Sequence, residues 1–199
     1  RRVLTLIPAL LVMGLVARGD RPLSAMVGEM RDLETIRLAL TAAETGHLVF
    51  GTLHTSSAAK TIDRIVDVFP AEEKEMVRAM LSESLQAVIS QRLLPRKDGK
   101  GRALAAEVMV VSGTIRDCIA DEQRASEIPE HIAQGRTTYG MQTFDQCLMD
   151  LVMNGQVDYA VAKAAATNPG DFELKMNMLS NRSGGAQAAP SPAMAGLSQ

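Results

Sequence analysis

Two side chains that can move protons, Glu29 and His54, each stand at the end of an apolar run of strand length. If the two runs are neighbouring strands of an open parallel sheet, both residues lie at the carboxyl ends of strands, where such sheets bind ligands. A carboxylate there can hold a metal-bound water or accept its proton, and an imidazole can contact a terminal phosphate. A plainer interpretation also fits, with Glu29 as an exposed turn residue paired with Arg31 and His54 as a residue at a helix start near Ser56.

The residues between the two runs have the pattern of a helix that would connect the strands. Asp32 can cap it, apolar residues recur at helical spacing over 33–43, and Gly46 can end it. The following run, 47–53, is apolar throughout, which is typical of a strand buried on both faces of a parallel sheet. A strand, a helix and a second strand joined by a right-handed crossover are therefore predicted, and the two candidate residues should be neighbours.

The rest of the chain divides into an α/β part and a helical part. A second helix is expected from Ser57 to Phe69, followed by a long helix over about 71–94. A turn rich in structure-breaking residues at 95–102 and a strand over 103–111 would complete the α/β part. Helices are expected in the remainder at 114–120, 126–134, 143–153 and 158–166, with a short last helix after Asn168-Pro169.

Composition places the chain among ordinary globular proteins and limits its partners. Of the 199 residues, 46% are hydrophobic and 22% are charged, so a packed core is expected. The net charge of −2 gives no bulk attraction for nucleic acid or an anionic membrane, and an aromatic content of 3% argues against stacking on single-stranded nucleic acid. No nucleic-acid partner is expected, and any phosphate chemistry must be local.

The two cysteines and the two remaining histidines show no metal-ligand spacing. Cys118 and Cys147 have apolar neighbours and form no C-x-x-C pair, so buried free thiols in a reducing compartment are expected. His47 at a strand start and His131 in a helix are predicted to be structural, because no H-x-x-x-H or His/Cys cluster accompanies them. No direct metal site is predicted from these residues.

The two ends of the chain differ from the rest. An apolar run over 3–17 is shorter than the about 18–20 residues of a membrane-spanning helix, and no clean cleavage pattern follows it. This segment is expected either to pack on the rest or not to belong to the domain. Residues 180–199 are nearly all small or polar and cannot offset their ordering entropy, so they are predicted to form a disordered tail.

A wider match links the candidate residues to a known family. Residues 27–35 and 45–55 closely resemble the Walker B and histidine-box stretches of secretion-type ATPases, specifically the PilT-type ATPases that retract type IV pili. Further similar stretches lie at 60–64, 69–73, 90–93, 140–145 and 168–172. The resemblance implies an α/β fold, with these divisions: an unmatched apolar leader over 1–25, a partial RecA-like P-loop NTPase core over 26–112, an all-helical C-terminal domain over 113–179 and the tail over 180–199.

The resemblance also implies roles for individual residues. Glu29 would be the Walker B carboxylate near Mg²⁺ and the attacking water, and His54 the histidine-box residue near the γ-phosphate. Four neighbours would support them in binding nucleotide: Gly28, Arg31, Thr52 and Thr55. In this family, a further motif is linked to retraction. Three residues of this chain match it, namely Ile115, Arg116 and Ile119, whereas Asp117 and Cys118 differ from it. The two isoleucines are equally well spaced for a buried i, i+4 pair.

In its complete form, a protein of this family would bind ATP and Mg²⁺ and hydrolyse ATP. The resemblance implies a homohexamer at the cytoplasmic face of the inner membrane, acting with the pilus platform protein of that membrane to draw pilin subunits out of the pilus. Zinc is not expected, because two cysteines cannot supply the four-cysteine zinc module of the related secretion ATPases.

One part of a nucleotide site is missing from the sequence. No G-x-x-x-x-G-K-[ST] motif occurs, so no loop of this kind is available to cradle the phosphates. We therefore expect the chain to be the C-terminal portion of such an ATPase, joined to an unrelated or frame-disturbed leader and inactive by itself. Two alternatives stay open, namely a non-catalytic interaction fragment and an extrusion or secretion ATPase of the same superfamily.

Overall fold

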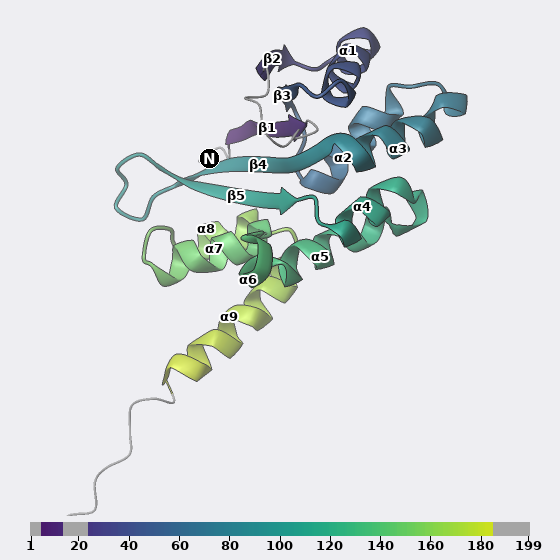
Figure 1. Ribbon diagram of the computed structural model, residues 1–199. Helices are drawn as coiled ribbons and strands as arrows, with labels where there is room; N and C mark the ends of the chain where they lie inside the picture. Colours follow the sequence, from purple (N-terminus) through teal and green to yellow (C-terminus); the bar gives the residue numbers. More distant parts are fainter. Residues whose placement is uncertain (1–4, 14–23, 185–199) are drawn as a thin grey trace, which may run out of the picture.

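The computed structural model describes residues 5–13 and 24–184, and a mixed β-sheet runs through them (Figure 1). The described strands lie in the order β2-β3-β1-β4-β5. They are β1 (Thr5–Met13), β2 (Ser24–Glu29), β3 (Leu48–Leu53), β4 (Leu85–Pro95) and β5 (Arg102–Val110). β2 and β3 are parallel, whereas β1 runs antiparallel to both β3 and β4, and β4 pairs antiparallel with β5. Part of the expected leader thus packs on the rest as the middle strand.

The predicted strand–helix–strand unit is confirmed. Helix α1 (Leu33–Glu44) connects β2 to β3, and Asp32 caps it by accepting a hydrogen bond from the Thr35 N–H at 2.8 Å. Gly46 has a φ of +91°, a conformation that glycine adopts without steric cost, and its N–H donates to the Ala43 carbonyl at 3.1 Å. The helix ends where the sequence predicts, and the chain turns directly into β3.

The predicted long helix over 71–94 is wrong in its second half. The structure has a 3-10 turn η1 (Ala71–Glu73) and helix α3 (Lys74–Ser84), after which residues 85–95 form β4. The apolar residues of this stretch fit helical and strand spacing alike, so periodicity alone could not separate the two. Residues 85–95 form a strand because they pair antiparallel with β5, from Ala87 opposite Val110 to Pro95 opposite Arg102.

The other predicted helices are present with small differences at their ends, and the structure adds two short segments that the sequence did not predict, η2 (Glu122–Glu127) and α6 (Arg136–Tyr139). α2 (Ala58–Asp67) is capped by Ser57, as predicted. The helical part consists of α4 (Gly113–Ala120), the 3-10 segment η2, α5 (Ile128–Gln134), α6, α7 (Phe144–Met153), α8 (Tyr159–Ala165) and α9 (Pro169–Gly184). The last helix is not short but has 16 residues, so 180–184 belong to a helix rather than to the predicted tail. Residues 185–199 of that tail lie outside the described residues.

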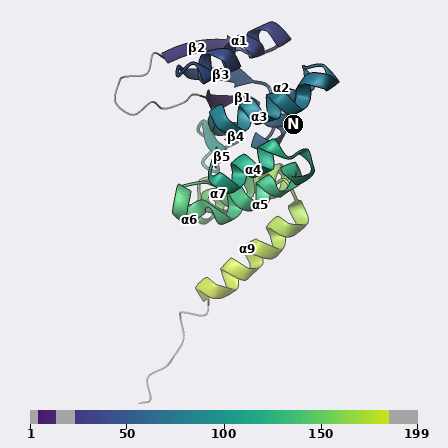
Figure 2. The same ribbon diagram turned by 45° about the vertical axis from the view of Figure 1, so that its right-hand side comes forward.

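Among the residues whose burial the structure describes, the buried apolar side chains form two clusters. The larger joins α1, α2, α3 and α4 to β3 and includes Ile36, Ile62 and Leu81. The smaller joins the β4–β5 hairpin to α7, α8 and α9, with Phe144 and Phe172 at its centre. Helices α5 to α8 lie along β5, and α9 extends away from them (Figures 1 and 2). In the described ranges, no helix combines the length and the apolar character that crossing a membrane requires.

Candidate active site

Glu29 and His54 meet at the carboxyl ends of two neighbouring parallel strands. Glu29 is the last residue of β2 and is paired with Thr52 of β3, while His54 directly follows β3. His54 Nε2 lies 2.8 Å from Glu29 Oε1. The N–H of Met30 donates to the Thr52 carbonyl at 2.9 Å, and this hydrogen bond keeps the ends of β2 and β3 next to each other. The structure thus brings together the two side chains that the sequence placed at adjacent strand ends.

Arg31 completes a group of three around the carboxylate. Its guanidinium lies 2.6 Å from Glu29 Oε2, so each carboxylate oxygen has one nitrogen partner. The side chain of Glu29 is 29% exposed, compared with 55% for His54 and 73% for Arg31. The carboxylate is therefore the most sheltered of the three groups, and its two partners are more exposed to solvent.

Arg31 also sets the charge of the carboxylate. Its hydrogen bond lowers the pKa of the Glu29 carboxyl more than partial burial raises it, and the positive charges of Arg31 and His54 act in the lowering direction too. The same hydrogen bond raises the pKa of Arg31. Glu29 is therefore ionised at neutral pH, which is the form that accepts a hydrogen bond from a water or from a hydrated cation.

The strand framework beneath the carboxylate depends on a close contact between Met30 and Gly51. Met30 is 3% exposed, and a Cβ on Gly51 would lie 2.8 Å from its Sδ and Cε atoms. Because Gly51 has no side chain, the Met30 side chain can pack directly against the backbone of β3. Across the same pair of strands, the Thr52 hydroxyl donates to the Gly28 carbonyl at 3.3 Å. Gly28 and Thr52 belong to the framework that supports the carboxylate.

Thr55 directly follows His54 at the start of the loop that leads to α2. Its hydroxyl is 2.6 Å from that of Thr61 in α2, and the residue is 8% exposed. The Thr61 hydroxyl also donates to the Ser57 carbonyl at 2.9 Å. Thr55 therefore fixes the loop between His54 and α2, and its hydroxyl is engaged inside that loop.

Two residues that sequence reasoning missed hold the same loop. Arg92 of β4 donates to the carbonyls of Ser56 and Ala165, both at 3.0 Å, and its guanidinium lies 4.0 Å from the centre of the Phe144 ring. Arg92 thereby connects the loop after His54 to the helical part. The incorrect helix prediction concealed this role of Arg92. In a strand, Arg92 and Ser90 lie on the same face of the sheet, whereas in a helix they would not.

The second missed residue is Glu107 of β5, which is opposite Ser90 in the β4–β5 pair. Its Oε1 accepts a hydrogen bond of 2.7 Å from the N–H of Ala58, the first residue of α2. Burial raises the pKa of the Glu107 carboxyl, and the Ala58 N–H and the charge of Arg92 oppose that shift. A strand alternation over 85–95 is the signal that would have placed Glu107 and Arg92 close together.

The residues of the predicted retraction motif are divided between core and surface. Ile115 and Ile119 in α4 are both 0% exposed and belong to the larger apolar cluster, as the i, i+4 alternative implies. Arg116 is 44% exposed and lies 3.9 Å from Glu83 of α3. The two isoleucines anchor α4, and Arg116 is the member of the motif that a partner can reach.

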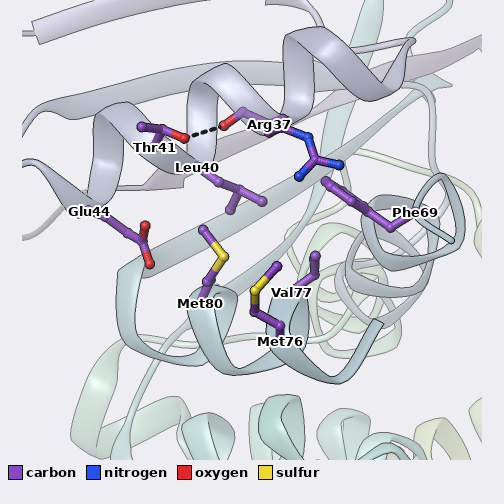
Figure 3. A pocket seen from close by; sticks show the side chains of 8 residues that line it. All are labelled: Arg37, Leu40, Thr41, Glu44, Phe69, Met76, Val77 and Met80. Atoms are coloured by element: carbon purple, nitrogen blue, oxygen red, sulfur yellow. Dashed lines mark hydrogen bonds between the residues drawn. The ribbon is translucent and has the colours of Figure 1, made fainter. Parts of the chain in front are cut away.

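A concave region lies between α1 and α3, away from Glu29 and His54 (Figure 3). Its volume is about 370 Å³, and Leu40, Phe69 and Met80 provide much of its wall. Arg37 at its edge pairs with Glu73 at 2.7 Å and lies over the Phe69 ring. This groove is mainly apolar and its lining contains no carboxylate–imidazole pair. The candidate active site is therefore the one at the ends of β2 and β3, where Glu29 contacts His54.

Comparisons with known proteins give a consistent set of relatives. The family model described as "Type II/IV secretion system protein" matches residues 17–167, and so begins inside the expected leader. A type IV pilus retraction ATPase, PilT of Pseudomonas aeruginosa, is 60% identical over 147 residues, which cover 74% of this chain and 42% of that protein. A twitching motility protein of Neisseria gonorrhoeae is 57% identical over 143 residues, which cover 72% of this chain and 38% of that protein.

The solved structures include a close match in fold. A crystal structure of the pilus retraction motor PilT with bound ADP superposes with a TM-score of 0.65 at 45% sequence identity, covering 75% of this chain and 41% of that one. The chain therefore spans about two-fifths of the length of the relatives that it matches.

Proposed function

Because the chain belongs to the family of type II/IV secretion system proteins, we propose that it is the part of a pilus retraction ATPase that supplies the catalytic carboxylate and its histidine partner. The observation that carries this proposal is the 2.8 Å contact between His54 and Glu29 at the ends of two parallel strands. Glu29 accepts a hydrogen bond from a water and orients it for attack on a terminal phosphate. His54 and Arg31 hold the carboxylate in position.

The residues fit part of a nucleotide site. Mg²⁺ prefers oxygen ligands and keeps several waters, and the ionised, half-buried Glu29 offers oxygens to such a hydrated cation. When bound, Mg²⁺ neutralises the charge that develops on the phosphates. The phosphates of ATP also need a cradle of backbone N–H groups and a lysine, and the sequence holds no P-loop motif. We propose that the cradle lies outside these 199 residues.

We base the proposed assembly and location on the same family. PilT is named as a pilus retraction ATPase, and we propose ATP-driven retraction of a type IV pilus for the complete protein. In this proposal it forms a hexamer at the cytoplasmic face of the inner membrane and acts on the pilus platform protein there. Identity of 60% to a retraction ATPase favours this role over extrusion or secretion.

A chimera tests the proposal with the missing part restored. Residues 26–179 of this chain would replace the matching segment of the Pseudomonas aeruginosa relative, and steady-state ATP turnover would be measured. The chimera should hydrolyse ATP, and Glu29→Gln should lower turnover about 10²-fold or more, because the group that orients the water is lost.

Glu34→Gln is the matched control, since Glu34 is an exposed glutamate in the first turn of α1. It should leave turnover unchanged, and circular dichroism should show both variants folded. If Glu29→Gln turns over ATP as fast as the control, Glu29 is not the catalytic carboxylate.

A further inference from the structure

Three potential metal ligands from separate turns of the helical part meet at one point. The Cys118 sulfur, one carboxylate oxygen of Glu127 and one ring nitrogen of His131 all lie within 4.8 Å of one another. This trio is remote from the Glu29 site in the sequence and lies where α4 packs on η2 and α5. The proposed ATPase function uses none of the three side chains.

Local structure explains why the three side chains converge. Glu127 ends η2 and directly precedes α5, and His131 lies one turn later at i, i+4, the spacing that puts two side chains on one helix face. Cys118 is 0% exposed and comes from the preceding helix, α4. Sequence spacing gave no sign of the trio, because the cysteine and the histidine lie on different helices.

The distances are close to those of a tetrahedral zinc site. The Cys118 sulfur is 3.9 Å from Glu127 Oε2, and His131 Nε2 is 3.6 Å from the same oxygen. With Zn–S near 2.3 Å and Zn–N and Zn–O near 2.0–2.2 Å, ligand atoms at tetrahedral angles are about 3.3–3.6 Å apart. Shifts of a few tenths of an ångström would therefore bring these two pairs to the distances of a zinc site, and the third pair, Cys118 and His131, lies within 4.8 Å.

The hydrogen bonding of the trio leaves ligand positions open. His131 Nε2 is buried and has no hydrogen-bond partner among the described residues. At 3.9 Å, the thiol of Cys118 is weakly engaged with Glu127. Arg124 donates to both carboxylate oxygens of Glu127, with its shortest contact of 3.0 Å to Oε2, and so orients the carboxylate. The Glu127 carboxylate oxygen lies 3.6 Å from this nitrogen, which leaves room for a closer ligand.

We propose that Cys118, Glu127 and His131 bind one Zn²⁺ ion, with water as the fourth ligand. Thiolate and imidazole select zinc over Mg²⁺ and Ca²⁺, which take oxygen ligands, so this site differs in chemistry from any magnesium site at Glu29. The ion ties α5 to α4, the helix that carries Ile115, Arg116 and Ile119. Zinc thereby fixes the position of that helix at the start of the helical part.

Cobalt substitution of the full, untagged chain tests the site. Co²⁺ added to metal-free protein should give a near-ultraviolet thiolate-to-cobalt absorption band and intense visible bands of four-coordinate cobalt, titrating to one ion per chain and displaced by Zn²⁺. Cys118→Ser should abolish the thiolate band, and His131→Gln should weaken binding at least tenfold. Zn²⁺ should also raise the Tm of the wild-type chain but not that of Cys118→Ser, because a ligand that binds only the folded state stabilises it.

Two matched variants serve as controls. Cys147→Ser removes the other thiol, and His47→Gln removes a histidine that contacts the Thr45 hydroxyl and the Ala42 carbonyl. Both should bind cobalt as the wild type does, and each variant's fold is checked by circular dichroism before titration. The proposal is overturned if the wild-type chain gives no thiolate band, if Cys118→Ser keeps it, or if Cys147→Ser loses it.

Discussion

At the scale of single residues, the site depends on one carboxylate with two different partners. Arg31 is two positions from Glu29 in the sequence and needs little of the fold to reach it. His54 reaches Glu29 because β2 and β3 pair in parallel. The exposed ion pair with Arg31 contributes little to stability, so its main effect is on the charge of the carboxyl group.

Replacing Arg31 by glutamine should raise the pKa of the Glu29 carboxyl toward that of a free glutamate, because the hydrogen bond that lowers it most is lost. A carboxyl-carbon NMR titration measures this pKa directly. Arg37→Gln is the control, since Arg37 pairs with Glu73 and should leave Glu29 unaffected. A Glu29 pKa that stays constant or falls in Arg31→Gln would contradict the assignment.

Gly51→Ala should destabilise the chain by about 1 kcal/mol, the low end of the cost of overpacking, because the end of the Met30 side chain can shift. Its new Cβ would meet the buried Met30 side chain at 2.8 Å. Urea unfolding of Gly51→Ala and of Gly113→Ala gives the comparison, because a Cβ at Gly113 meets nothing within 4 Å. Equal stabilities for the two variants would show that Met30 is not packed against Gly51.

At the scale of elements, the sequence predicted those helices and strands whose ends are marked by nearby residues, such as helix caps and glycines. The Asp32 cap, Gly46 and the apolar run after it predicted the β2–α1–β3 unit, and with it the position of Glu29 beside His54. Residues 85–94 were assigned to a helix because their strand state depends on pairing with β5, a tertiary contact. Arg92 and Glu107 were missed for the same reason, as was the pairing of β1 with β3 and β4.

Glu107→Gln should make stability less dependent on pH. Burial raises the folded-state pKa of Glu107, so its contribution to stability is full below the unfolded pKa of about 4.3 and is lost as the pH rises through the folded value. Relative to wild type, the glutamine variant should therefore become more stable as the pH rises above about 4. Urea unfolding across that range measures the difference.

Glutamine keeps an oxygen that can accept from the Ala58 N–H, which makes Glu107→Gln a test of charge rather than of the hydrogen bond. Glu83→Gln, at a mostly exposed position, is the matched control for replacing a glutamate by glutamine. A stability difference between Glu107→Gln and wild type that is constant with pH would rule out a raised pKa.

At the scale of the whole molecule, the described residues hold two apolar clusters with the β4–β5 hairpin between the α/β part and the helical part. Arg92 connects the two parts through the Ser56 and Ala165 carbonyls. The family was recognisable from the sequence because its motifs are local, whereas the trio of Cys118, Glu127 and His131 forms only in the folded chain.

The purified 199-residue chain should show no ATP turnover above background, because no P-loop motif is present to bind the phosphates. A coupled assay for ADP release, with the Pseudomonas aeruginosa relative as the positive control, measures this. Turnover that disappears in Glu29→Gln would show that the chain binds ATP through other groups.

The contact between the His54 imidazole and the Glu29 carboxylate can be observed most directly by long-range ¹H–¹⁵N NMR. At a pH well above the ordinary histidine pKa of about 6.5, the spectrum shows which ring nitrogen carries the proton. We predict that Nε2 carries it, donating to Glu29, and that Glu29→Ala shifts the Nε2 resonance. A ring protonated at Nδ1, or a His54 spectrum that Glu29→Ala leaves unchanged, would contradict the account.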